Sequence, residues 1–111
     1  MSKFLFIYHA PTTPAENTPT DPAEMEAVMG QWMEWAGRVG EGMVDFGTPL
    51  ADGVRVTPEG SSPATSDVVG YSIIEAADQQ AALALAEGHP HLNMPGGCTI
   101  EIHAAQPVPG M

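Results

Sequence analysis

The chain has 111 residues, and its 14 acidic side chains against three Lys and Arg give a formal net charge of −11. Proteins that bind nucleic acid draw most of their affinity from Lys and Arg on phosphates, so this composition excludes nucleic-acid partners. The same field repels an anionic membrane surface, and no apolar run approaches the roughly 20 residues that span a bilayer. The hydrophobic fraction of 43% instead predicts one folded domain over residues 1–111.

The cysteine content bears on the compartment. Cys98 is the only cysteine and cannot form an internal disulfide, so a reducing cytoplasm is the simplest location. No neighbour in sequence supplies the positive charge that would lower the pKa of this thiol. We therefore expect Cys98 to be a buried, inert side chain.

The first element is a predicted strand over residues 3–9, which are aromatic and β-branched. Alternation gives it two apolar faces, Phe4–Phe6–Tyr8 and Leu5–Ile7–His9. A single layer of helices covers only one face of a sheet. The other face therefore needs a partner.

A proline-containing loop over residues 10–20 leads to a predicted helix that ends at Gly40. Asp21 is a capping residue, Pro22 suits the first helical position, and Glu24 follows three residues after the cap. The apolar residues of this helix recur at helical spacing, which predicts that they form a core stripe. These residues are Met25, Val28, Met29, Trp32, Trp35, Ala36 and Val39.

Three strands and one helix are predicted in the remainder of the chain, joined by turns and loops. Gly70 is expected to mark a bulge or a close backbone approach, and prolines 107 and 109 exclude the tail from a central strand. The predicted segments are a strand at 43–50 with a short continuation at 54–56, a loop at 58–67, a strand at 68–75, a helix at 76–87 and a strand at 98–104.

This order predicts an α+β protein with the ferredoxin-like βαββαβ arrangement, in which two helices cover one face of an antiparallel sheet. The apolar residues on the other face suggest a homodimer in which two such sheets pack as a dimeric α+β barrel. A monomer with a few exposed aliphatic side chains is the alternative.

The segments FLFIYHA, GTPL, VVGYSIIEAADQQAALALAEGHPHL and GGCTIEIHAAQPVPG together resemble the YCII-related (DGPF-type) family over almost the whole chain. The resemblance implies the dimeric α+β barrel in a stand-alone bacterial protein. Some relatives are proposed to use a histidine near the first helix with an aspartate before a proline after the second helix, and one branch is a dehydrochlorinase. At the matching positions this chain has Glu24 and, before Pro90, His89, so the implied pair is inverted. The loop at 58–67 stands where one branch has the DGPF tetrapeptide.

His89 and His91 flank Pro90 and are the first candidates for chemistry. The helix dipole and a nearby carboxylate would raise the pKa of His89, which suits a general acid or base; capping of the helix is the structural alternative. His91 is either a half-exposed loop residue or, with His89 and His9, part of a three-histidine metal site. No metal ligand set is predicted without a further motif.

His9 ends the first strand on an apolar face, where it either lines a pocket or is a satisfied core residue. His103 shares a face with Glu101 and is expected to be exposed. No phosphate-binding or nucleotide-binding glycine motif and no nucleophile elbow is present, so no cofactor is expected.

Two hypotheses of different class follow. The first is a cofactor-independent acid–base enzyme, lyase- or isomerase-like, acting on a small neutral cyclic molecule. Its catalytic residues would be His89, His9 and Glu24, and its substrate-binding residues Tyr8, Trp32, Thr48, Tyr71 and His91. The second is a non-catalytic small-molecule-binding or accessory module that uses the same pocket. A buried His89–carboxylate pair would favour the first, and a dry apolar cavity without such a pair the second.

Overall fold

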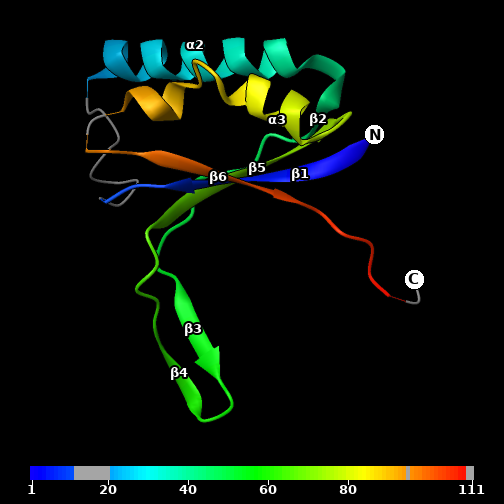
Figure 1. Ribbon diagram of the computed structural model, residues 1–111. Helices are drawn as coiled ribbons and strands as arrows, with labels where there is room; N and C mark the ends of the chain where they lie inside the picture. Colours follow the sequence, from blue (N-terminus) through cyan, green and yellow to red (C-terminus); the bar gives the residue numbers. More distant parts are fainter. Residues whose placement is uncertain (12–20, 95, 110–111) are drawn as a thin grey trace.

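A computed structural model of the protein describes residues 1–11, 21–94 and 96–109. The helices α2 (Pro22–Val39) and α3 (Gln79–Ala86) lie together on one face of a four-stranded sheet (Figure 1). A hairpin projects from the sheet on the side away from the helices (Figure 1). The predicted α+β class, with two helices on one face of an antiparallel sheet, is confirmed.

The sheet contains β1 (Ser2–His9), β2 (Met43–Asp45), β5 (Val68–Ala76) and β6 (Thr99–Ala104) in the order β2-β5-β1-β6. Every neighbouring pair is antiparallel. The two strands that flank α2 are therefore separated by β5, which is compatible with a ferredoxin-like fold.

The core lies between the sheet and the helices. Phe4, Phe6 and Tyr8 of β1 point to the helices and are buried, as their alternation predicts. Phe6 packs against Trp35 of α2 with ring centroids 5.9 Å apart. Ile74 of the neighbouring strand is fully buried in the same cluster. These contacts fix α2 over the centre of the sheet.

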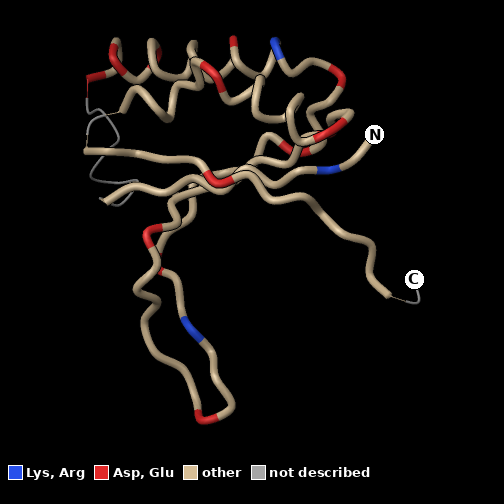
Figure 2. Tube along the Cα trace, in the orientation of Figure 1, with Lys and Arg blue, Asp and Glu red and all other residues tan. Residues whose placement is uncertain are grey.

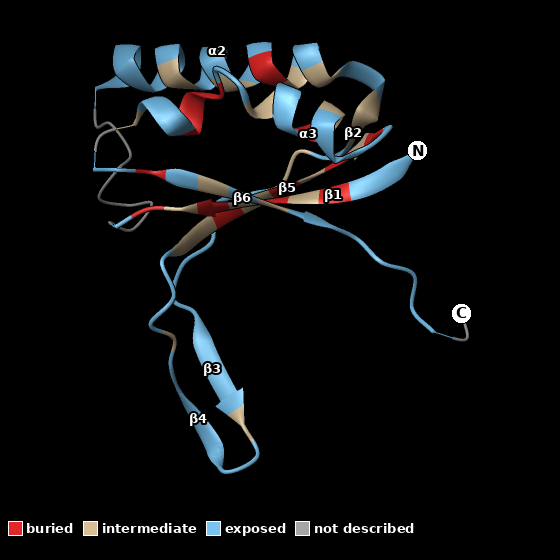
Figure 3. Cartoon of the chain, viewed as in Figure 1, coloured by how far each residue is buried: buried red, intermediate tan, exposed pale blue. Residues whose placement is uncertain are grey.

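The opposite face of the sheet, called the open face here, has no helix over it (Figure 3). It is formed by the alternate residues of three strands, which register places side by side. Its apolar members are only half-buried. The open face comprises Lys3, Leu5, Ile7 and His9 of β1, Tyr71, Ile73 and Glu75 of β5, and Thr99, Glu101 and His103 of β6.

A bulge interrupts the pairing of β1 with β5. Tyr8 lies opposite Gly70 and His9 opposite Val68, so Val69 has no partner. A Cβ on Gly70 would lie 3.3 Å from both the Tyr8 ring and the Thr48 carbonyl oxygen. The predicted bulge or close approach at Gly70 is confirmed.

The helix starts follow their capping residues. Asp21 Oδ1 accepts a hydrogen bond from Ala23 N at 3.0 Å, and α2 ends before Gly40, as predicted. The second helix begins later than its predicted start at residue 76. Ala76 still pairs within β5, and Asp78 is the cap, accepting from Ala81 N at 2.9 Å.

The segment between β2 and β5 differs most from its prediction. The strand expected at 43–50 ends at Asp45. The predicted loop at 58–67 contains a strand, β4 (Gly60–Pro63), which pairs with β3 (Val54–Thr57). A two-residue turn joins the two strands, and this local pairing forms a hairpin from residues with weak strand propensity. The prediction of a loop at 10–20 falls largely on residues outside the described part of the chain.

Acidic side chains are spread over both layers and the hairpin, whereas the three basic ones lie far apart (Figure 2). Within the described residues, no helix is long and apolar enough to cross a membrane.

Candidate functional site

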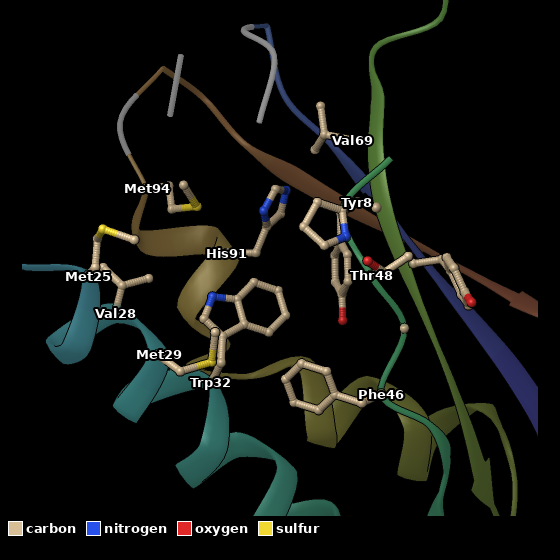
Figure 4. Close-up of a pocket in the computed structure, with 14 residues that line it drawn as sticks. Tyr8, Met25, Val28, Met29, Trp32, Phe46, Thr48, Val69, His91 and Met94 are labelled. Atoms are coloured by element: carbon tan, nitrogen blue, oxygen red, sulfur yellow. The ribbon is translucent and has the colours of Figure 1, made fainter. Parts of the chain in front are cut away.

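A pocket of about 260 Å³ lies between the N-terminal half of α2 and the bulged end of β5 (Figure 4). Its walls are predominantly apolar. Met25, Val28, Met29 and Trp32 come from α2, Phe46 and Thr48 from the segment after β2, Val69 from the bulge, and His91 and Met94 from the segment before β6.

The pocket corrects the prediction that the apolar stripe of α2 is core. Trp35 is buried, but Met25 and Met29 remain 46% and 56% exposed. The stripe is continuous in sequence, whereas the sheet beneath its N-terminal half offers Gly70, which has no side chain to fill the space. The first two turns of the stripe therefore border a cavity.

Aromatic rings form the inner wall of the pocket. The ring of Trp32 meets that of Tyr8 edge-on, with centroids 5.3 Å apart, and lies 6.1 Å from that of Phe46. Such walls suit a flat, apolar ligand. The methionines at the mouth are flexible and can adapt to its outline.

His91 is the imidazole that lines the pocket, and it is almost fully buried rather than half-exposed as expected. It lies in the short helix η2 (Pro90–Asn93), where its Nε2 donates a hydrogen bond to the His9 carbonyl oxygen at 2.9 Å. Burial lowers the pKa of His91, and hydrogen bonds to the backbone of His9 and Thr99 oppose this only in part. The pocket therefore presents a neutral imidazole at neutral pH.

His89 is fully buried beside the pocket, under Trp32 and Trp35. Its Nδ1 accepts a hydrogen bond from the backbone N–H of His91 at 3.0 Å, so the proton of the neutral ring lies on Nε2. Nε2 is 3.1 Å from the hydroxyl of Tyr8 and donates to it.

The hydrogen bond from His89 begins a chain that runs in one direction. The Tyr8 hydroxyl donates to Ser72 Oγ at 2.7 Å, and Ser72 donates to the Phe46 carbonyl oxygen at 2.6 Å. Burial raises the pKa of the Tyr8 phenol, and its hydrogen bond to Ser72 only partly offsets this. Every donor in the chain has an acceptor, so the core holds these polar groups without an unpaired proton.

The expectation that the helix dipole and a carboxylate raise the pKa of His89 is wrong. Burial, with smaller contributions from the charges of His91 and Arg38, lowers this pKa to about 3. At the end of α3, Arg38 Nη2 donates to the carbonyl oxygens of Leu85 and Glu87 at 2.8 and 2.6 Å. The negative end of the α3 dipole was expected to stabilise protonated His89, but its carbonyl oxygens already bind the guanidinium of Arg38.

Of the remaining predicted site residues, some line the pocket and others lie outside it. Tyr8, Trp32, Thr48, Tyr71 and His91, the residues predicted to bind substrate, all border the pocket, and Tyr71 does so from a strand position whose side chain alternates to the open face. The Tyr71 hydroxyl donates to Asp45 Oδ2 at 3.2 Å, which raises the pKa of that phenol. Glu24 is exposed in the first turn of α2, and both ring nitrogens of His89 bond to other groups.

His9 places its side chain on the open face, away from the pocket. Its Nδ1 donates to Asp67 Oδ1 at 2.6 Å, and its Nε2, 3.6 Å from Glu101 Oε1, is buried without a hydrogen-bond partner among the described residues. Glu101 accepts from His103 Nε2 at 2.9 Å. The pKa of Asp67 is lowered chiefly by its hydrogen bond from His9, and that of Glu101 chiefly by its bond from His103.

The sequence did not point to Asp67, which belongs to the segment predicted as a loop. Its meeting with His9 depends on the bulge that sets His9 opposite Val68. To predict this pair, one would have needed the register between β1 and β5, including the bulge.

The metal alternative for the three histidines is not supported by their positions. His91 bonds through Nε2 to a carbonyl, His89 is enclosed in the core, and His9 faces the other side of the sheet. Within the described ranges, no group of three His, Cys, Asp or Glu side chains is arranged to hold a metal ion. Cys98 is buried as predicted, and burial raises the pKa of its thiol.

In comparisons with known proteins, no family model and no curated protein matches the sequence of this chain.

Proposed function

We propose that this chain is a small-molecule-binding or accessory module whose pocket takes a small, neutral, ring-containing molecule. The observation that carries this proposal is an apolar pocket with an aromatic wall and a neutral imidazole, His91, but no carboxylate side chain among the described residues that line it. The net charge of −11 further disfavours an anionic ligand.

The environment of His89 supports binding over acid–base chemistry. A general base needs a free lone pair within reach of the substrate, but Nδ1 of His89 already accepts the His91 N–H. Nε2 donates a hydrogen bond to Tyr8, and no carboxylate in the described part of the chain bonds to the ring to stabilise an imidazolium. An apolar cavity without a histidine–carboxylate pair among the described residues supports a binding module.

Acid–base catalysis is the second candidate, and the His9–Asp67 pair favours it. The carboxylate holds Nδ1–H of His9, as in an oriented general base, and Nε2 has no hydrogen bond among the described residues. Nε2 is buried 3.6 Å from Glu101 Oε1, so Glu101 would have to move aside for a substrate to reach it. This pair lies on the open face. A substrate would have to bind between two copies of the chain, in the homodimer that the half-buried apolar residues of this face favour.

Ligand binding can be tested by methyl NMR of the methionines, titrated with p-cresol and, as an anionic counterpart, p-hydroxybenzoate. We expect p-cresol to shift the signals of Met25, Met29 and Met94, which line the pocket, and to leave Met33 unchanged. Met33 lies on the same helix, is 58% exposed and does not border the pocket. The anion should bind at least about 10-fold more weakly.

A matched pair of substitutions locates the site. Met29→Trp should fill the mouth of the pocket and weaken p-cresol binding at least 10-fold, whereas Met33→Trp should not, with Met25 and Met94 as reporters in both. Equal binding by the two variants, or shifts spread over all methionines, would overturn the proposal.

A further inference from the structure

The hairpin of β3 and β4, called the arm here, has almost no cover from the rest of the chain. Seven of its eight strand residues are exposed, among them Val54 at 64% and Val56 at 77% (Figure 3). A two-stranded hairpin is marginal in water on its own. The arm and the C-terminal segment both project from the sheet (Figure 1), and the radius of gyration is 15.5 Å, when a compact chain of this length has about 13 Å.

The two faces of the arm differ in chemistry. Val54 lies opposite Pro63 and Val56 opposite Ser61, so one face carries an apolar stripe. Arg55 lies opposite Ser62 on the other face, and it is the only charged residue on the arm's two strands. Two exposed valines on one face of an unsupported hairpin mark a contact surface rather than a solvated loop.

The arm and the open face are unpartnered surfaces on the same side of the molecule. Figure 1 shows the arm projecting from the sheet away from the helices, so the arm borders the space in front of the open face. The open face carries half-buried Leu5, Ile7 and Ile73. One chain thus offers both halves of an apolar contact, which is what a two-fold pair of identical copies requires.

Charge favours this face over others for the approach of two copies that each carry −11. Glu101 on the face and Asp67 at its border accept hydrogen bonds from His103 and His9, and Glu75 lies opposite Lys3, so each carboxylate has a basic side chain beside it. The apolar stripe of the arm carries no charge. Repulsion between copies is therefore smaller here than on the outer surface of α2, where Glu24, Glu26 and Glu34 are exposed.

We infer that the partner of the arm is a second copy of this chain. The stripe of Val54 and Val56 packs against the open face of that copy, and the two arms are exchanged across a two-fold axis. This inference rests on the proposed homodimer and adds to it that the arm contributes the contact.

Sedimentation of the full chain over a range of concentrations tests the inference. We expect a dimer whose dissociation constant falls as salt is added, because salt screens the repulsion between like-charged copies. The variant Val54→Thr/Val56→Thr keeps β-branched side chains but replaces a methyl with a hydroxyl at four sites per dimer. It should raise the dissociation constant at least 10-fold.

The control is Val108→Thr, which changes an equally exposed valine of the C-terminal segment outside the arm and should leave the dissociation constant unchanged. A monomeric wild type would overturn both the dimer and the role of the arm. A dimer that is unaffected by the double substitution would overturn the role of the arm alone.

A spin label identifies the surface that the arm touches. The label is attached to Val56→Cys in a Cys98→Ala background, and this chain is mixed with unlabelled, ¹⁵N-enriched wild type. We expect broadening of the amide signals of Leu5, Ile7 and Ile73 in the enriched copy. Broadening elsewhere, or none in a dimeric sample, would contradict the inference.

Discussion

The histidines on the two faces of the sheet differ in burial and in hydrogen bonding. Under the helices, His89 is fully buried, and its hydrogen bonds form a closed chain through Tyr8 and Ser72. On the open face, His9 is held by an exposed carboxylate and keeps one nitrogen without a hydrogen bond. Histidine is often assumed to be catalytic, but His89 is part of the core on one face, and His9 on the other face has a ring nitrogen without a hydrogen bond among the described residues.

The largest difference between the faces should appear when neighbouring residues of β1 are truncated. Phe6 is fully buried against Trp35, so Phe6→Ala should lower the free energy of unfolding by about 3–5 kcal/mol. Ile7 points to the open face and is only half-buried, so Ile7→Ala should cost less than half as much in the monomer. Urea denaturation at a concentration that keeps the chain monomeric measures both. Equal losses would show that the open face is covered within one chain.

A smaller effect is the pH dependence of stability that the buried His89 causes. The unfolded chain protonates His89 near its ordinary pKa of 6.5, but the folded chain does so only near 3. Below about pH 6.5 the unfolded state therefore binds more protons, and the free energy of unfolding falls by up to about 1.4 kcal/mol per pH unit as pH is lowered toward 3. Above pH 6.5 this group contributes no pH dependence. The lowered pKa of His91 acts in the same direction.

The matched variants are His89→Asn and His103→Asn, compared by urea denaturation at about pH 7 and pH 5. Asparagine at position 89 can still accept from the His91 N–H but cannot titrate, so this variant should be less stable than wild type at pH 7 and lose less stability on acidification. The variant at position 103 removes an exposed imidazole and should change stability at pH 7 less than His89→Asn does. The carboxylates with lowered pKa, Asp67 and Glu101, affect stability only below about pH 4, outside this window. A pH dependence unchanged by His89→Asn would contradict a buried neutral ring.

What the sequence predicted well depends on local signals. The first strand shows its two faces by alternation, and α2 shows its limits by Asp21, Pro22 and Gly40. Alternation and capping depend on residues close in sequence, so tertiary packing does not change the structure that they predict. The arm lacked them, because GSSP has little strand propensity and is paired only through its short turn with β3.

The site depended on tertiary arrangement, which local patterns do not contain. The stripe of α2 gives no sign of where the sheet beneath it lacks side chains, so the pocket at Met25 and Met29 was predicted as core. The pKa of His89 depends on burial and on Arg38, which approaches from another helix. Trp32 and His91, which were predicted to bind substrate, line the pocket, but the sequence did not indicate which histidine faces the cavity.

The smallest expected effect concerns the carboxylates of the open face. The hydrogen bond from His9 is the main cause of the lowered pKa of Asp67, and that from His103 of the lowered pKa of Glu101. In the monomer, His9→Ala should therefore return the pKa of Asp67 toward its ordinary value, and His103→Ala should do the same for Glu101. Because the charge of His9 also lowers the pKa of Glu101, His9→Ala should move both carboxyls, whereas His103→Ala should move only one. Carboxyl ¹³C titrations measure the pKa of each group separately. A changed pKa of Asp67 in the His103→Ala variant would show a coupling between Asp67 and His103 that the distances among these four side chains do not explain.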